Sequence, residues 1–289
     1  MDRLPFYVTP EEFESLQNVQ ESNILKSDDL LLWTSYNLDF KNRWLRKKLW
    51  FISASLITLF LIGIGLSVNP KDFTYLNEIT WIYIVCLSIG WSSSYVSYAI
   101  DDYFEYIVSS KGIVVKQSFS EPKWVSTFVK WIGVVGSVIS FTFFMIIGPS
   151  ALVGVGGFLL LLFVLLNKKP PRVDRKLVLK NQILGGLYNK NRNVVCIFSS
   201  IDSCFPSMQI KDGVYRAHVN TALYLFPNKE VGLSNIVSFT QNELGISIKE
   251  TDDIDEIFEM EKRPEEYQSF SGQMENFSLD ELKLKKNLK

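Results

Sequence analysis

Residues 49–68 read LWFISASLITLFLIGIGLSV and contain no Asp, Glu, Lys, Arg or His. Similar charge-free runs occupy residues 79–100 and 131–167, although the 289-residue chain is 21% charged overall, with a net charge of −1. A bilayer requires about 20 apolar residues to cross about 30 Å of hydrocarbon, whereas soluble core helices have no such requirement. This segregation predicts a membrane protein and argues against an ordinary soluble protein, a disordered chain or a disulfide-stapled secreted domain.

The longest of these runs predicts two crossings rather than one. It has 37 residues and is interrupted by Gly148, Pro149 and Ser150, which favour a turn. The predicted fold class is therefore an integral membrane α-helical protein with four transmembrane helices and a cytoplasmic β-rich α+β domain. The helices form two hairpins, at residues 49–68 and 79–100 and at residues 124–147 and 151–167.

Basic residues are concentrated on one side of the predicted spans. Close to the predicted spans, fifteen Lys and Arg residues lie before the first span, between the second and third, or after the fourth, whereas the opposite loops contain only Lys71. Because cytoplasmic loops carry the excess of Lys and Arg, both termini are expected in the cytoplasm. We therefore expect a multi-pass protein of a bacterial inner (cytoplasmic) membrane with N-in/C-in topology.

The N-terminal segment, residues 1–48, is predicted to be cytoplasmic and helical. Thr9, followed by Pro10 and Glu12, forms a capping signature that predicts a helix to about Val19. A second helix is predicted from Ser27, through the apolar residues that follow it. Two β-rich runs in the loop 101–123 predict a β-hairpin that joins the C-terminal domain.

Residues 168–250 are predicted to form a β-rich cytoplasmic domain. Asp212 and Gly213 give a hairpin signal. After this turn, Arg216, His218 and Asn220 alternate with apolar residues, which predicts a strand whose polar side faces water. The strands are expected at residues 177–179, 194–198, 208–211, 214–226 and 236–239.

Residues 251–289 are predicted to be an acidic, helical tail. Nine acidic residues lie between Glu250 and Glu266, against two basic ones, and Ser278 with Glu281 forms a second capping box. Residues 172–175 (RVDR), the strands through Phe226 and the later helix resemble the pleckstrin-homology-like (PH-like) barrels that follow the spans of some bacterial membrane proteins. This resemblance implies an architecture and does not imply a function.

Sequence motifs for catalysis, phosphate binding or metal binding are missing. The chain has no GxxxxGK[ST], GxGxxG, HExxH or GxSxG pattern, and the spacing of Cys196 and Cys204 does not fit a zinc site. His218 is the only histidine, and we expect it to be a half-exposed surface residue rather than a general base. We predict a protein that is not an enzyme, has no cofactor or metal and binds no nucleic acid.

Two groups of residues are candidates for binding. The basic residues beside the predicted spans are expected to contact anionic lipid headgroups: Arg46, Lys47, Lys48, Lys168, Lys169, Arg172, Arg175 and Lys176. Small residues at close spacing in the second and third spans predict helix packing within the bundle, or a subunit interface or pore: Gly90, Ser92, Ser93, Ser94, Ser97, Gly133 and Ser137.

These observations favour a membrane-anchored interaction or sensor protein that binds a protein partner through its cytoplasmic domain. The alternative is an oligomeric pore or membrane effector gated by that domain, for example a bacterial defence or toxin–immunity component. A homo-oligomer fits this alternative, and an enzyme or transporter with an unrecognised site is a third hypothesis.

Overall fold

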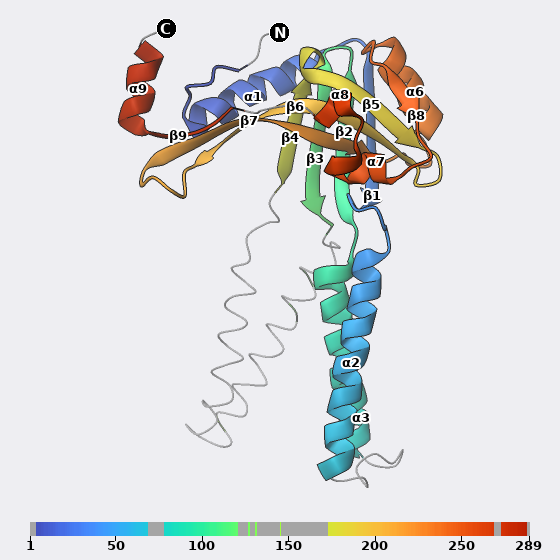
Figure 1. The fold of residues 1–289 in the computed structure, drawn as a ribbon. Helices are drawn as coiled ribbons and strands as arrows, with labels where there is room; N and C mark the ends of the chain where they lie inside the picture. The colour runs from blue at the N-terminus through green and yellow to red at the C-terminus, as the bar shows by residue number, and fades with distance from the viewer. Residues whose placement is uncertain are drawn as a thin grey trace. The chain divides into compact units, whose positions relative to one another are not determined.

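The computed structural model describes residues 4–68, 78–120, 127, 131, 145, 173–268 and 273–287. The chain divides into two compact units. Met1–Arg43, Asp101–Ser118 and Val173–Lys289 make up the β unit, and Trp44–Ile100 with Phe119–Arg172 makes up the helical unit. Figure 1 shows the elements of each unit along the chain.

The first sheet of the β unit has four strands in the order β1-β2-β3-β4. β1 pairs antiparallel with β2, with Trp33 opposite Tyr106, and β3 pairs antiparallel with β4. The strands are β1 (Leu30–Asn37), β2 (Asp102–Ser109), β3 (Gly112–Phe119) and β4 (Asp174–Leu179). The strands expected in the loop 101–123 are thus present.

The helix predicted from Ser27 is wrong, because these residues contain strand β1. Trp33, Ser35 and Asn37 are buried while the residues between them are exposed, which is the period-two pattern of a strand. Consecutive apolar residues carry no helical periodicity, and the pairing with β2 determines their conformation.

The second sheet has five strands in the order β8-β5-β6-β7-β9, with β5 and β8 parallel and the other pairs antiparallel. The strands are β5 (Ile183–Asn189), β6 (Val194–Pro206), β7 (Gly213–Leu225), β8 (Ile248–Glu250) and β9 (Met274–Ser278). The helices of this part are η4 (Lys180–Gln182), α6 (Leu233–Asn242), α7 (Asp255–Phe258), η5 (Met260–Lys262), α8 (Glu265–Gln268) and α9 (Leu279–Asn287). The strand predicted at residues 236–239 is therefore wrong, because Ile236 and Thr240 form the buried side of α6.

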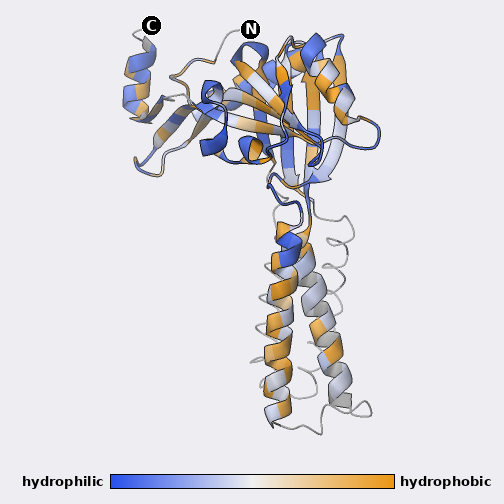
Figure 2. Cartoon of the chain, turned by 45° about the vertical axis from the view of Figure 1, so that its right-hand side comes forward, coloured by the Kyte–Doolittle hydropathy of each residue, from blue (hydrophilic) through white to orange (hydrophobic). Residues whose placement is uncertain are grey.

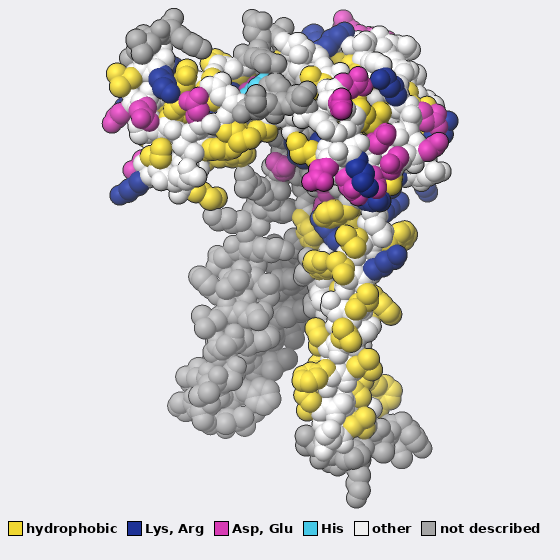
Figure 3. Space-filling model, in the orientation of Figure 1, with side chains coloured by type: hydrophobic (Ala, Val, Ile, Leu, Met, Phe, Trp, Pro, Cys, Tyr) yellow, Lys and Arg dark blue, Asp and Glu magenta, His cyan; other side chains and the backbone are white. Residues whose placement is uncertain are grey.

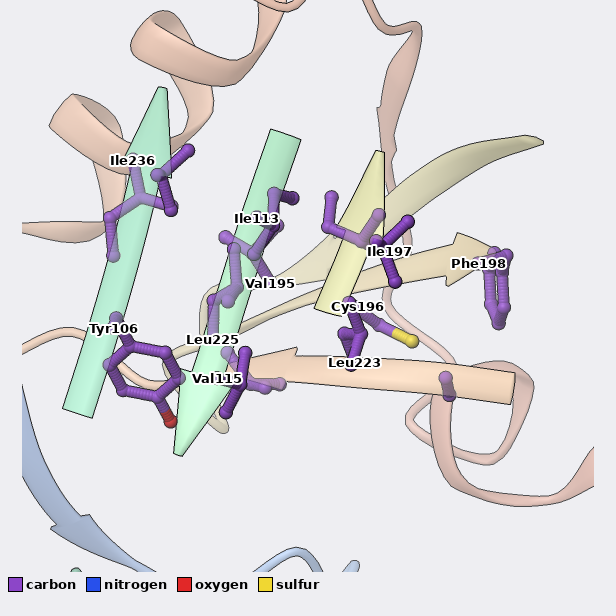
Figure 4. Close-up of a cluster of buried hydrophobic side chains, with 14 of the residues drawn as sticks. Tyr106, Ile113, Val115, Val195, Cys196, Ile197, Phe198, Leu223, Leu225 and Ile236 are labelled. Carbon is purple, nitrogen blue, oxygen red and sulfur yellow. The ribbon is translucent and has the colours of Figure 1, made fainter. Parts of the chain in front are cut away.

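The main core lies between the two sheets, as Figure 4 shows for its central side chains. Tyr106 and Ile113 from the first sheet pack with Ile197, Leu223 and Leu225 from the second, and all five are buried. Each apolar side chain removed from water in this way stabilises the fold by about 1.5–3 kcal/mol. Two packed sheets replace the PH-like barrel that the sequence resembles.

Helix α1 (Pro10–Leu25) begins at the predicted capping box, in which Thr9 and Glu12 bond each other's backbone amides. It continues past Val19 because its second half binds the first sheet. Ile24 is fully buried against β2, β3 and β4. The Glu21 carboxylate accepts hydrogen bonds from Lys116 Nζ at 2.6 Å and from Arg175 Nη1 at 3.0 Å.

The helical unit contains α2 (Leu45–Val68), α3 (Glu78–Ser94) and the π-helix η2 (Tyr95–Ala99). Among the described residues, one helix is long and apolar enough to cross a membrane, Leu45–Ser67, whose mean hydropathy is 2.2. Figure 2 shows the hydrophobic residues along α2.

The predicted fold class with four transmembrane helices is therefore wrong. The structure is mainly a β-rich α+β fold with one candidate membrane helix in the described part. The predicted span 79–100 is not one regular α-helix, because the α-helical hydrogen bonding of α3 ends after 17 residues and η2 follows. The predicted spans 124–147 and 151–167 lie outside the described residues, apart from Thr127, Trp131 and Met145.

Replacing Glu21 with Gln should destabilise the protein by about 1–3 kcal/mol at neutral pH, because it removes the negative charge that Lys116 and Arg175 bind and one of the two acceptor oxygens. Burial raises the pKa of Glu21, but the bonds from Lys116 and Arg175 outweigh it and lower the pKa below the ordinary 4.5. The carboxylate therefore stabilises the fold above the unfolded-state pKa, and this contribution is lost as the pH falls through the folded-state pKa.

Denaturant unfolding of the full chain and of Glu21→Gln, followed from neutral to acidic pH, measures this difference. The two stabilities should converge at acidic pH. Glu14→Gln is the control, because Glu14 lies exposed on the same helix. A constant difference at every pH, or an equal effect of the control, would contradict the role of the Glu21 carboxylate.

Candidate functional site

The second sheet extends beyond the first. β6 and β7 each have 13 residues, whereas no strand of the first sheet has more than eight. The face that carries Ile197 and Leu223 in the core therefore continues along β6 and β7 to a part where the first sheet no longer covers it. We call this continuation the open face. Its side chains are Ser203, Phe205, Tyr215, Ala217, Val219, Met274 and Asn276, of which Ala217 is buried.

The open face is partly apolar and exposed to solvent. Phe205 is 47% exposed and Met274 is 56% exposed, while Tyr215 and Val219 are half-buried. Figure 3 shows hydrophobic side chains gathered along this extension of the sheet. A contiguous apolar area rimmed by polar residues is typical of a protein-binding surface.

The opposite side of the same strands is covered. Residues 4–8, which we call the N-terminal strap, pack with Phe277 of β9 and Leu282 of α9. The Phe6 and Tyr7 rings meet the Phe277 ring edge to face, at centroid distances of 5.9 and 5.3 Å. The strap, α1 and α9 thus leave only one side of the extension available.

Arg216 fixes the strap to the sheet. Its side chain is 0% exposed, and its Nη2 donates to Asp202 Oδ1 at 3.0 Å and to Pro5 O at 3.3 Å. Nε donates to Phe6 O at 3.2 Å, and the guanidinium lies over the Phe13 ring at 4.8 Å. A buried charge is stable only when it is paired and its donors are bonded, and both conditions hold here.

His218 lies between a hydroxyl and a carboxylate. One ring nitrogen, Nε2, is 2.9 Å from Ser200 Oγ, and the other, Nδ1, is 3.1 Å from Asp202 Oδ1. The expectation of a half-exposed surface histidine is wrong, because the side chain is only 12% exposed. The wider expectation that β7 turns its polar side to water is also wrong, since Arg216 and His218 lie on the covered side.

The Ser200–His218–Asp202 arrangement resembles the hydrogen-bond order of a serine hydrolase, but its surroundings favour a structural role. Ser200 is only 2% exposed, so a substrate has little access to its hydroxyl. Asp202 also binds Arg216 and accepts Gln182 Nε2 at 3.1 Å, so its carboxylate is part of the strap anchor. The network satisfies polar groups between two hydrophobic clusters.

The thiols of the β unit are buried. Cys204 donates to Val8 O at 3.6 Å, and burial raises the pKa of its thiol to about 11. Burial also raises the pKa of Cys196. Because the thiolate is the reactive form, both cysteines are poor nucleophiles at neutral pH.

Two cavities lie away from the open face. One of about 400 Å³ lies beside the N-terminal strap and is lined by Phe6, Leu16 and Lys286, among others. The other, of about 670 Å³, contains Lys111 and Lys180, whose amines donate to the carbonyls of Asn23 and Glu243 near helix ends. In the described part of the chain, no three His, Cys, Asp or Glu side chains group as metal ligands would.

The structure separates the residues expected to bind lipid headgroups. Arg46, Lys47 and Lys48 lie in the first turn of α2. Arg175 binds Glu21, Asn18 and Gln17 of α1, and Lys176 is half-buried on β4. Lys168, Lys169 and Arg172 lie outside the described residues.

Five of the seven small residues expected at a helix interface or pore lie in α3 or η2. Ser94 accepts a bond from Trp50 Nε1 at 3.0 Å and so joins α3 to α2, as does the bond from Trp91 Nε1 to Thr58 Oγ1 at 2.7 Å. Gly90 and Ser92 are exposed. The structure describes the backbone of Ser93 and Ser97 only, and Gly133 and Ser137 lie outside the described residues.

Sequence reasoning missed the open face. The pattern of β7 indicated two different sides, but the charged side was assigned to solvent and the apolar side to the core. The signal that could have revealed the open face is the length of the strands. Strands of 13 residues cannot be fully covered by strands of six to eight.

Asp202→Asn should lower the free energy of unfolding by about 3–5 kcal/mol, because it leaves the buried Arg216 without its carboxylate. Ser200→Ala should cost only about 0.5–1.5 kcal/mol, since it removes a single hydrogen bond of a hydroxyl group. Denaturant unfolding of the full chain measures both effects. Equal losses would show that the Arg216–Asp202 pair is not the main anchor.

Comparison with known proteins identifies the family. No curated protein and no solved structure matches the chain. A family model described as "TsiV2 immunity protein" matches residues 11–266, which is most of the chain. An immunity protein acts on a toxin, so the family implies a protein partner. The chain belongs to the TsiV2 immunity protein family.

Proposed function

We propose that this chain protects a cell by binding a toxin through the open face of its β unit. The observation that carries the proposal is an apolar sheet face that continues from the core yet leaves Phe205 and Met274 exposed. Family membership supports a protein as the occupant. The buried Ser200 and the unreactive thiols favour action by binding rather than by catalysis.

We further propose that α2 and α3 hold the β unit at the inner face of the bacterial inner (cytoplasmic) membrane. The apolar side chains of α2 are largely exposed, as expected of a helix whose solvent is lipid. Arg46, Lys47 and Lys48 lie at its start, which favours a cytoplasmic position for that end.

The pairing of the first sheet supports a hairpin rather than a single crossing. β1 precedes α2 and β2 follows α3, yet they pair from Leu30 opposite Ser109 to Asn37 opposite Asp102. This pairing supports a topology in which both ends of the α2–α3 segment lie on the same side of the membrane. The bonds from the Trp50 and Trp91 indoles between the helices fit such a hairpin.

Two lysines in the middle of α2, Ile57→Lys with Phe60→Lys, should release the chain from membranes. Each is expected to cost about 2.5–3.5 kcal/mol for insertion, because a charged side chain at the centre of a span is poorly solvated. Alkaline carbonate extraction of membranes, followed by detection of the full chain, measures the effect. Leu284→Lys is the control, since Leu284 is exposed on α9 of the β unit. Extraction of the unchanged chain would contradict anchoring.

Genes adjacent to the gene of this chain supply the candidate toxins for a test. Cells that express the toxin among them should survive when they also express the chain. Survival should fall when Phe205→Asp is introduced, because a charge replaces an exposed aromatic side chain on the open face. Colony counts with matched protein levels measure protection. If Phe205→Asp protects as well as the unchanged chain, the open face is not the toxin-binding surface.

A further inference from the structure

β9 is an edge strand of the second sheet. The amide of His218 donates to the carbonyl of Gln273 at 2.8 Å, so the backbone groups of Gln273, Glu275 and Phe277 point toward β7. The N–H and C=O groups of Met274 and Asn276 then point away from the sheet. In an antiparallel ladder these are the groups that bind a neighbouring strand.

The side chains of β9 alternate between the two sides of the sheet. Phe277 and Glu275 lie on the covered side, where Glu275 pairs with Lys285 at 3.4 Å. Met274 and Asn276 lie on the open face. A strand added beside β9 would therefore extend the open face, with alternate side chains next to Met274.

Two other edges, those of β1 and β8, are less available. On β1, the backbone carbonyl of Thr34 accepts a hydrogen bond from Asn228 Nδ2 at 3.1 Å. The Trp33 indole of the same strand donates to the Phe226 carbonyl. β8 has only three residues. Proteins commonly protect edge strands with Lys, Pro or covering segments, and the outward side of β9 within the described residues carries none of these.

We infer that an extended segment of the toxin adds to the second sheet along β9. Its backbone pairs with Met274 and Asn276, and its alternate apolar side chains extend the open face beside Met274. We expect a strand because the edge of β9 presents backbone hydrogen-bonding groups. The side of that strand that continues the open face is expected to be apolar, because the open face is apolar. This inference rests on the proposed function and specifies how the toxin binds.

The test separates backbone pairing from side-chain contact at one position. Met274→Pro removes the outward N–H, and it leaves the bonds to β7 intact because those come from its neighbours. Met274→Ala keeps the N–H and shortens the side chain. Binding of the purified full chain in detergent to the toxin identified by the survival experiment is measured by calorimetry. Met274→Pro should weaken Kd about tenfold more than Met274→Ala does.

A second variant tests whether the toxin also contacts the open face on β6, away from the β9 edge. Phe205→Asp should weaken Kd about 30-fold or more if the phenyl ring is a central contact. Leu284→Asp is the matched control, because it places the same charge at an exposed leucine on α9. Thermal unfolding of each variant verifies that it is folded.

Amide hydrogen exchange of the unchanged chain gives a result that does not depend on any variant. On addition of the toxin, the amides of Met274 and Asn276 should exchange more slowly. Binding without this protection, or with equal affinity for Met274→Pro and Met274→Ala, would overturn strand addition and leave toxin binding intact. Absence of any binding would instead overturn the proposed function, and this inference with it.

A second copy of the chain is the competing occupant of the edge. Light scattering of the full chain without toxin should give a mass that Met274→Pro does not change. A dimer that Met274→Pro dissociates would assign the β9 edge to self-association and overturn the inference.

Discussion

A buried guanidinium must have a counter-ion and a bonded partner for its donors, and this requirement at Arg216 determines which side of the second sheet is covered. Asp202 supplies the charge, and the carbonyls of Pro5 and Phe6 accept further bonds. The N-terminal strap can supply those carbonyls only by lying across β7. The side opposite the strap is consequently the one left open.

Local signals in the sequence predicted the elements that depend on local chemistry. The capping box at Thr9 fixed the start of α1, and Asp212, which adopts a positive φ of 56°, marked the turn between β6 and β7. Long-range contacts decided the rest. Residues 30–33 form a strand because β2 lies beside them, and Arg216 is buried because residues 210 positions earlier bind it. Charge alone could not predict that burial.

The predicted span at residues 79–100 differs from the structure for a related reason. A charge-free run establishes that a segment tolerates lipid, but it does not establish a regular helix of sufficient length. In residues 79–100, the change from α3 to the π-helix divides the run. Among the predicted site residues, Arg175 had the right charge for a headgroup contact, but its donors are bonded to α1.

The construction of the second sheet reconciles stability with binding. An exposed apolar face and a free edge invite aggregation, so a protein can keep them only where the rest of the strand is held firmly. β6 and β7 meet this condition because one half of each strand lies in the core and the strap fixes the other half. The rigid extension needs little ordering when a partner binds, and binding to an ordered surface loses less conformational entropy. A preorganised sheet edge is therefore well suited to hold a toxin tightly.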